Sequence, residues 1–123
     1  MSVPATRRGH LADPSRAPSK GETVEEVFGL HGVVIEQILS GELASPVDFD
    51  QDHDEWVVLL DGGAELELDG ERCQLVPGDW ILLLRHTPHR LVRTDPASRW
   101  LAVRFAAEAP EETLPPVRRA PTR

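Results

Sequence analysis

Residues 50–62 read Asp50-Gln51-Asp52-His53-Asp54-Glu55-Trp56-Val57-Val58-Leu59-Leu60-Asp61-Gly62, an acidic stretch that runs directly into an apolar strand. From Asp48 to Glu55 there are five carboxylates in eight residues. Charge beside a buried strand costs free energy unless something compensates it. A bound cation would compensate it, whereas the alternative is a solvated acidic loop, because charge runs usually lie in water.

A second segment, residues 77–92, carries two histidines between a pair of predicted strands. It begins with Pro77-Gly78-Asp79, continues through an apolar run from Trp80 to Leu84, and then reads Arg-His-Thr-Pro-His up to His89. A carboxylate at the start of one strand and a histidine at the start of another are common ingredients of metal sites in small barrels. We therefore treat the two segments as halves of one candidate site.

The first segment resembles one of the two signature motifs of the cupin superfamily. That motif has a His-x-His pair, a Glu three or four residues later, and a Gly after six more, and Glu55 and Gly62 keep this last spacing. The positions of the histidine pair hold no histidine in either register. With the shorter gap they fall on Phe49 and Gln51, and with the longer gap on Asp48 and Asp50.

The second segment resembles the other cupin motif. Gly78-Asp79 and His89 match it, so the resemblance gives Glu55 and His89 two of the family's four metal-ligand positions. The resemblance covers about residues 24–106 and transfers the fold more safely than any one chemistry. The remaining positions depart from the motif: Leu84 and His86 replace the Pro and Gly of Pro-x-Gly, and Arg93 stands at the Asn position.

Strand alternation predicts which of these side chains point inwards. Glu55 shares a face with Val57 and Leu59, which belong in a core, and His89 shares a face with Leu91. The identity of the third metal ligand remains open. His53 is favoured because imidazole is a good metal ligand, and Gln51 is favoured because it occupies a ligand position in the family motif. Asp50 could take part only if the strand begins with a bulge. The predicted metal ligands are Glu55, His89 and His53, and the predicted pocket or surrounding residues are Gln51, His86, Asp50 and Arg93.

The predicted cofactor is a divalent transition metal, because mixed nitrogen and oxygen ligation suits Fe, Mn, Ni, Cu or Zn. One hypothesis is a metal-dependent oxygenase, isomerase or lyase that acts on a small organic molecule. The charged cluster and the paired histidines favour it. The other hypothesis is a non-catalytic small-molecule-binding, sensor or accessory cupin, which the missing His-x-His pair favours.

The rest of the chain predicts one all-β domain, a cupin-type double-stranded β-helix (jelly-roll) barrel. Asp69-Gly70 is the clearest hairpin signal. Low hydrophobicity and several prolines predict a disordered N-terminal arm over residues 1–21 and a disordered tail over 109–123, flanking a domain at 22–108. Expected strands cover residues 24–28, 33–39, 43–49, 56–60, 64–69, 71–76, 80–84, 89–94 and 100–105.

Composition limits the partners. Net charge is −8, and residues 48–71 contain ten acids and no Lys or Arg, which argues against nucleic acid. No apolar run approaches the ~20 residues of a membrane span, and no apolar stretch follows the N-terminal arginines, so we expect neither membrane insertion nor secretion. A single cysteine, Cys73, excludes an internal disulfide and predicts a cytoplasmic protein. The cupin resemblance and an exposed strand edge also predict a homodimer.

Overall fold

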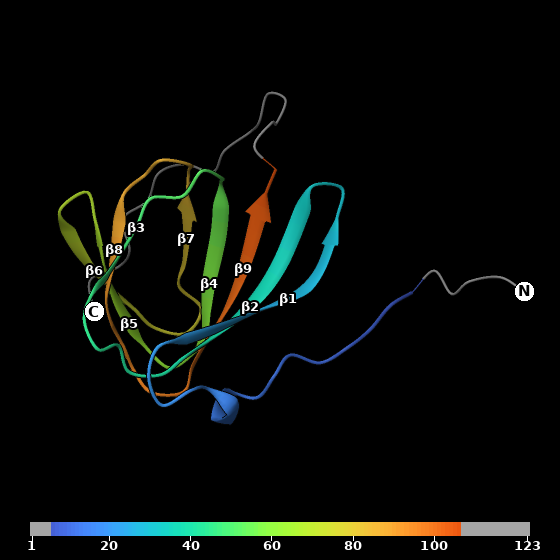
Figure 1. Ribbon diagram of the computed structural model, residues 1–123, viewed down its shortest axis with the longest axis horizontal. Coiled ribbons are helices and arrows are strands. Elements are labelled where there is room, and N and C mark those ends of the chain that lie inside the picture. The colour runs from blue at the N-terminus through green and yellow to red at the C-terminus, as the bar shows by residue number, and fades with distance from the viewer. Residues whose placement is uncertain (1–5, 107–123) are drawn as a thin grey trace, which may run out of the picture.

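The computed structural model describes residues 6–106, and these residues form an almost entirely β structure (Figure 1). They hold nine strands and one short 3-10 helix, η1 (Pro14–Arg16). No helix in this part of the chain is long and apolar enough to cross a membrane. The strands are β1 (Glu22–Leu30), β2 (Val33–Ser40), β3 (Val47–Phe49), β4 (Glu55–Asp61), β5 (Ala64–Leu68), β6 (Glu71–Leu75), β7 (Trp80–Leu83), β8 (His89–Thr94) and β9 (Ser98–Phe105).

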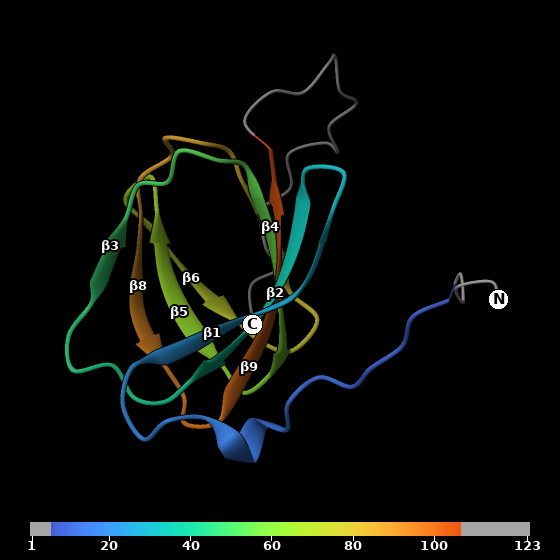
Figure 2. The ribbon, with the colours of Figure 1, turned by 45° about the vertical axis from the view of Figure 1, so that its right-hand side comes forward.

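The strands form two antiparallel sheets that face each other (Figure 2). The five-stranded sheet has the order β1-β2-β9-β4-β7, and the four-stranded sheet has the order β3-β8-β5-β6. Strands distant in sequence are neighbours in both sheets, as in a jelly roll. The prediction of an all-β jelly-roll barrel is therefore confirmed.

The core lies between the two sheets because alternate residues of each strand point inwards. In β4 the buried positions include Val57 and Leu59, and Leu59 is completely inaccessible to solvent. The four-stranded sheet contributes Leu66 and Leu91. These side chains interdigitate as in other sheet-on-sheet packings.

Buried hydroxyl groups tie the loops together at one end of the barrel, which we call the closed end. The Ser98 hydroxyl donates to the carbonyl of Asp95 at 2.7 Å and accepts from the amide of Gly63 at 3.2 Å. The Thr94 hydroxyl donates to the carbonyl of Gly41 at 2.5 Å. Because these hydroxyls satisfy backbone groups that lie out of reach of water, the loops at this end are closely packed.

The N-terminal segment differs from the predicted disordered arm from Ala12 onwards. The Ala12 amide donates to Oε1 of Gln37 at 2.8 Å, and the Ala12 carbonyl accepts from Arg99 at 3.3 Å. Lys20 forms a bridge with Glu42. The sequence pattern missed this because the segment is held by polar contacts with β2 and β9 rather than by apolar residues of its own. The predicted tail at 109–123 lies outside the described residues.

Two strand boundaries also differ from the sequence prediction. The expected strand at 43–49 shortens to β3, which begins at Val47 directly after Pro46, because proline has no amide hydrogen to donate to a ladder. The first strand is longer than expected and continues through Gly29. Its hairpin turn lies instead at His31-Gly32, where both residues have positive φ.

Candidate functional site

The candidate site lies at the end of the barrel opposite the closed end. We call this end the mouth, and it is formed by the loops 50–54 and 84–88, at the top of Figure 1. Glu55 is the first residue of β4 and His89 the first residue of β8, so the two facing sheets each present one of them here. Each is only 9% exposed, because each shares the inward face of its strand with core residues.

Glu55 is a carboxyl group in an apolar setting. Its burial raises the pKa above the ordinary value, and the nearby Glu36 raises it further. His53, His89 and Arg104 act in the opposite direction, because a positive charge carried by any of these groups would favour the carboxylate. The ionised form of Glu55 is therefore unfavourable in the folded protein unless a cation compensates it.

A pH dependence of stability follows for the metal-free protein. Because the folded-state pKa of Glu55 is raised, the stabilisation is fully present below the ordinary pKa of 4.5 and is lost as the pH rises through the folded-state value. Glu55→Gln does not titrate. In the presence of a chelator, we expect Glu55→Gln to unfold at higher urea concentration than the wild type at pH 7 and this advantage to shrink at pH 4. If the difference in unfolding urea concentration between Glu55→Gln and the wild type were equal at pH 7 and pH 4, a raised pKa of Glu55 would be contradicted.

His89 has a defined tautomer. Its Nδ1 lies 3.0 Å from the carbonyl oxygen of Thr87, and because a carbonyl only accepts, Nδ1 carries the proton. The imidazole also stacks on Phe49, with ring centroids 5.2 Å apart and planes inclined by 12°. These contacts fix the ring and leave the lone pair of Nε2 available, an arrangement that is common for metal-binding histidines.

His53 and Gln51 each bury a polar atom without a hydrogen-bond partner in the described structure. The two atoms are Nε2 of His53 and Oε1 of Gln51. Nδ1 of His53 lies 3.3 Å from Oδ1 of Asp52, which leaves the lone pair on Nε2. Buried polar groups without partners are costly and therefore rare. An electron-pair acceptor, either a metal ion or a hydrogen-bond donor of a ligand, would satisfy each of these atoms.

The two motif segments are joined at the mouth by hydrogen bonds. The amide of Arg85 donates to Oδ1 of Asp54 at 2.8 Å, and the amide of His86 donates to the carbonyl of Gln51 at 2.7 Å. Nδ1 of His86 lies 3.3 Å from Oδ1 of Asp50, where both side chains are exposed. His86 and Asp50 thus connect the loops from outside and do not point at the buried donors.

The backbone of His86 explains why the cupin motif has glycine at this position. His86 has a φ of 56°, in the left-handed region that glycine adopts without a steric penalty. Histidine is among the residues that occur there more often than most. The departure from the motif therefore preserves the turn and adds an imidazole.

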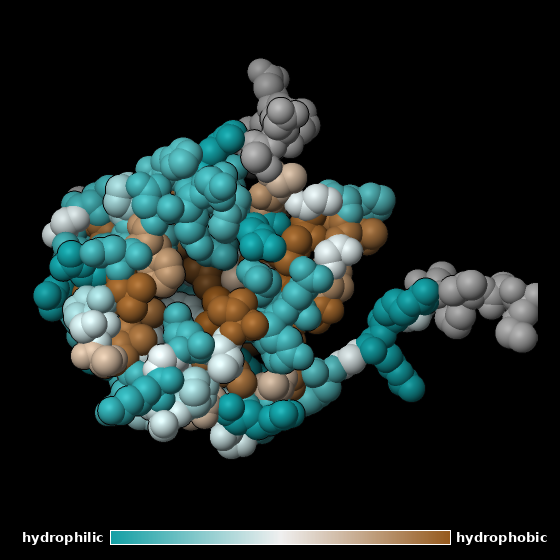
Figure 3. Space-filling view, in the orientation of Figure 1, coloured by the Kyte–Doolittle hydropathy of each residue, from teal (hydrophilic) through white to brown (hydrophobic). Residues whose placement is uncertain are grey.

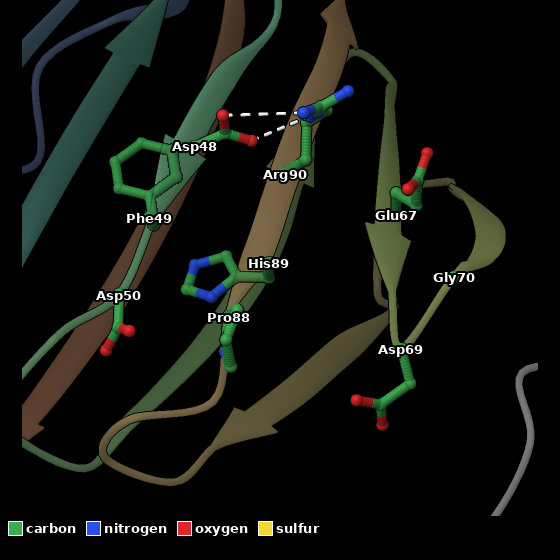
Figure 4. Close-up of a pocket in the computed structure, with 9 residues that line it drawn as sticks. All are labelled: Asp48, Phe49, Asp50, Glu67, Asp69, Gly70, Pro88, His89 and Arg90. Atoms are coloured by element: carbon green, nitrogen blue, oxygen red, sulfur yellow. Dashed lines mark hydrogen bonds and ion pairs between the residues drawn. The ribbon is translucent and has the colours of Figure 1, made fainter.

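An open cavity of about 410 Å³ has His89 in its lining, but not Glu55, His53 or Gln51 (Figure 4). His89 and Phe49 form one wall, and the ion pair of Arg90 and Asp48, 2.7 Å between Nε and Oδ1, forms another. His89 is thus shared between the cavity and the donor cluster at the mouth. The full lining is Asp48, Phe49, Asp50, Glu67, Asp69, Gly70, Pro88, His89 and Arg90.

The donors at the mouth suit a metal ion by their chemistry but are not gathered around one point. Across residues 6–106, no three His, Cys, Asp or Glu side chains are arranged around a point that could hold a metal. Glu55, His89 and His53 therefore meet at the mouth without converging. Their chemistry nevertheless fits a divalent transition metal, because they offer two imidazole lone pairs and a carboxylate, and Gln51 adds an amide oxygen.

Arg93, predicted to share the inward face of His89, does not join the site. The pairing of β5 with β8 shifts between Glu65 and Leu66, so Leu91 lies opposite Leu66 and Arg93 opposite Glu65. This bulge turns Arg93 outwards, where it is exposed and forms an ion pair with Asp95. Simple alternation along the strand cannot reveal a bulge, which depends on the partner strand.

Sequence reasoning missed two charged residues near Glu55. Arg104 is the neighbour of Glu55 across the β4–β9 pair, and Glu36 is close enough to raise the pKa of Glu55. The alternation of β9 places Arg104 on the inward face with Ala102 and Trp100. The sequence alternation alone therefore predicts that Arg104 points inwards, but only the pairing of β4 with β9 shows that Arg104 is the neighbour of Glu55.

The two sheets and the polar mouth define a small, single-domain β-barrel of the jelly-roll class. A comparison with protein families matches residues 34–104 to the Cupin domain family. The chain belongs to the cupin family, as its two motifs predicted.

Three solved structures illustrate the likeness. A putative mannose-6-phosphate isomerase from Ralstonia eutropha JMP134 is 30% identical with a TM-score of 0.67, and the match covers 80% of this chain and 100% of that one. KdgF from Halomonas sp. is 24% identical with a TM-score of 0.60, covering 69% and 80%. An RmlC-like cupin from Shewanella frigidimarina NCIMB 400 is 16% identical with a TM-score of 0.61, covering 81% and 93%. The comparison with curated proteins gives no match.

Proposed function

We propose that this cupin binds a divalent transition metal together with a small organic molecule at the mouth of the barrel. The observation that carries the proposal is the pair of buried atoms without partners, Nε2 of His53 and Oε1 of Gln51, beside the buried carboxyl of Glu55. All three offer electron pairs in a place where water does not reach the orphaned atoms. A cation is the one partner that satisfies lone pairs and also compensates a carboxylate.

Each residue has a distinct role in this proposal. Glu55, His89 and His53 would hold the metal, and Gln51 would add an amide oxygen. Fe, Mn, Ni, Cu and Zn all accept such ligands. When bound, the ion supplies a Lewis acid or an oxygen-activating centre. Thr87 and Phe49 hold the His89 ring in position, and Asp52 orients His53.

The size of the cavity supports a small organic molecule as the ligand. A volume of about 410 Å³ lies in the range of small-molecule sites, and one wall is His89 itself. A ligand in the cavity would therefore lie next to His89, the one proposed metal ligand among the residues that line it. Such a site could serve an oxygenase, an isomerase or a lyase. Of these three classes, the likeness to the Ralstonia eutropha protein favours an isomerase.

A second candidate function is a non-catalytic cupin that binds an organic ligand without metal. The observation that favours it is that no three His, Cys, Asp or Glu side chains converge in the described part of the chain. In that case hydrogen-bond donors of the ligand would satisfy Gln51 and His53. The two functions differ in metal content, which is measurable on protein purified without a histidine tag or added chelator.

Variants of the two orphaned residues test the proposal. We expect untagged wild-type protein to carry stoichiometric metal by elemental analysis, and titration of the metal-free protein with Zn²⁺ or Mn²⁺ to show one site. His53→Ala and Gln51→Ala should each weaken binding by about 10-fold or more, since even contacts outside the ligand shell change metal affinity 10- to 100-fold. The larger loss identifies the third ligand.

The matched control is His31→Ala. His31 is an exposed histidine in the β1–β2 turn, far along the chain from both motifs, and its loss should leave the affinity unchanged. Metal-free wild-type protein that binds neither ion more tightly than the His53→Ala variant would reject the metal proposal and leave the ligand-binding alternative.

A further inference from the structure

The cavity that His89 lines has an excess of negative charge. Its lining includes one guanidinium, that of Arg90, against four carboxylates: Asp48, Asp50, Glu67 and Asp69. The cavity adjoins the mouth, because two of its lining residues, Asp50 and Pro88, belong to the mouth loops or border them. Figure 3 shows hydrophilic residues gathered over these loops, at the top of the view. A ligand that enters here meets an acidic surface.

The carboxylates lie on both sides of the strand that carries His89. Figure 4 shows Asp48 and Asp50 on one side of β8, and Glu67 and Asp69 on the other. The strand pairing gives the same order, since β8 pairs with β3 along one edge and with β5 along the other. A molecule in the cavity would therefore have negative charge on two sides.

The two carboxylates on the β3 side already have partners. Both oxygens of Asp48 accept from the guanidinium of Arg90, at 2.7 and 3.4 Å. Oδ1 of Asp50 lies 3.3 Å from Nδ1 of His86. The positive charge that the protein supplies to this cavity is thus concentrated on the β3 side.

The two carboxylates on the β5 side are more available to a ligand. Oε2 of Glu67 lies 4.0 Å from Nε of Arg72, whose side chain is 62% exposed. The side chain of Asp69 has neither an ion pair nor a hydrogen bond among residues 6–106. Glu67 and Asp69 therefore present negative charge to the cavity that the described residues compensate weakly.

A second cavity shows that an acidic lining is not a general property of hollows in this protein. This cavity has a volume of about 340 Å³, and its charged lining residues are Glu42, Arg93 and Asp95. Arg93 and Asp95 form an ion pair with each other. Its charges nearly balance, although the whole chain carries a net charge of −8. The excess of carboxylates is thus particular to the cavity beside His89.

The acidic lining does not form a metal site of its own. Within the described range 6–106, no three His, Cys, Asp or Glu side chains could hold one metal ion. A metal ion requires oxygen donors that converge on one point. An organic cation instead carries several N–H donors, and it can form charge-assisted hydrogen bonds with carboxylates that lie apart.

We propose that the small organic molecule bound in this cavity is a cation, with an ammonium or guanidinium group held by Glu67 and Asp69. The inference rests on the proposed function, since it takes this cavity as the place where the organic molecule binds. Phosphorylated or carboxylated molecules are disfavoured, because juxtaposed like charges cost several kcal/mol at an interface.

His89 determines which end of such a cation lies near the proposed metal. Its side chain lines the cavity and is 9% exposed, and its Nε2 accepts no hydrogen bond from the described residues. The positive charge of a metal held by His89 would repel an ammonium group, whereas Glu67 and Asp69 attract it. The cationic group therefore belongs on the β5 side, and the uncharged part of the molecule points toward His89.

Three molecules with the same four-carbon chain test this charge preference. At neutral pH, 1,4-diaminobutane is a dication, 1,4-butanediol is uncharged and succinate is a dianion. In NMR titrations of the full ¹⁵N-labelled chain, diaminobutane should bind with a dissociation constant of about 1–10 mM, as expected for so small a molecule. The amide signals of Asp69 and Gly70 should shift. The diol and succinate should leave these signals unchanged at the same concentrations.

Variants of the two available carboxylates test their role. Glu67→Gln and Asp69→Asn keep the size of each side chain, and asparagine tolerates the positive φ of Asp69, 50°. Each variant should weaken diaminobutane binding about 2- to 5-fold, as for partly exposed ion pairs, and the double variant by the product of the two. The matched control is Glu26→Gln, which removes an exposed carboxylate of β1 and should not change the affinity.

Several outcomes would overturn the inference. They are binding of succinate or the diol as tight as that of diaminobutane, unchanged affinity in the double variant, and equally large shifts along β1, which would reflect the overall charge alone. A parallel titration with Zn²⁺ separates this inference from the proposed function. If Zn²⁺ binds at one site and diaminobutane does not bind, the ligand class is wrong and the metal proposal stands. If diaminobutane binds and Zn²⁺ does not, the ligand class stands and the metal proposal fails.

Discussion

Glu55→Gln is expected to abolish tight metal binding, with a loss of more than about 100-fold in affinity. The substitution keeps the shape of the side chain and one carbonyl oxygen but removes the negative charge. Because Glu55 is 9% exposed and burial already raises its pKa, the folded protein pays for the carboxylate unless a cation is bound. Contacts outside the ligand shell account for 10- to 100-fold in metal affinity, so a ligand should account for more. Calorimetric titration of metal-free protein measures the loss.

Variants of the histidines distinguish the loss of a metal ligand from the unspecific loss of a histidine side chain. His89→Ala should lose metal as Glu55→Gln does, whereas His10→Ala should not, because His10 is exposed in the N-terminal segment. His86→Ala should cost about 10- to 100-fold, since His86 holds the 50–54 loop from outside. If Glu55→Gln keeps the metal content of the wild type, the acidic stretch is a solvated loop and the proposed site is wrong.

Gly62→Ala is expected to cause a large loss of folding stability, because it combines a positive φ with a close neighbour. Gly62 has a φ of +89°, and a Cβ at this position would lie 2.7 Å from the Cα of Ser98. The left-handed conformation costs an alanine about 1–2 kcal/mol, and overpacking against a rigid neighbour adds about 1–3 kcal/mol. Ser98 cannot move away easily, because its hydroxyl is held by Asp95 and Gly63. Urea unfolding at neutral pH measures the difference.

Gly70→Ala is the matched control for this substitution. Gly70 also has a positive φ, +76°, but a Cβ there would meet nothing within 4 Å. It should therefore lose only the ~1–2 kcal/mol of the backbone term. Equal losses in the two variants would show that the packing of Gly62 against Ser98 contributes nothing to stability.

Much of the fold was predictable because its signals are local. Alternation in residues 64–68 and the Asp69-Gly70 pair predicted the β5–β6 hairpin, and both turn residues have positive φ, 50° and 76°. Spacing from Glu55 to Gly62 and the position of His89 identified the family because these motifs mark the ends of strands. The order of the strands in the two sheets is not a local property, and it follows only from the strand pairing in the structure.

The parts that sequence reasoning missed depend on contacts between distant segments. The bulge that turns Arg93 outwards arises from the pairing of β5 with β8. Cross-strand pairing also determines that Arg104 is the neighbour of Glu55 and that Phe28, Ile35 and Trp56 form one row. None of these relations has a signature within a single strand. The buried atoms of Gln51 and His53 likewise follow from the meeting of two loops.

The closed end of the barrel has a consequence for how a ligand of the proposed site would enter and leave. Ser98 and Thr94 bind the loops together there, whereas the buried donor atoms of Gln51 and His53 lie at the opposite opening. A molecule bound at the mouth, as proposed above, would leave through the opening by which it entered. Two such molecules would then compete for the same free form of the protein, because one has to leave before the next can bind.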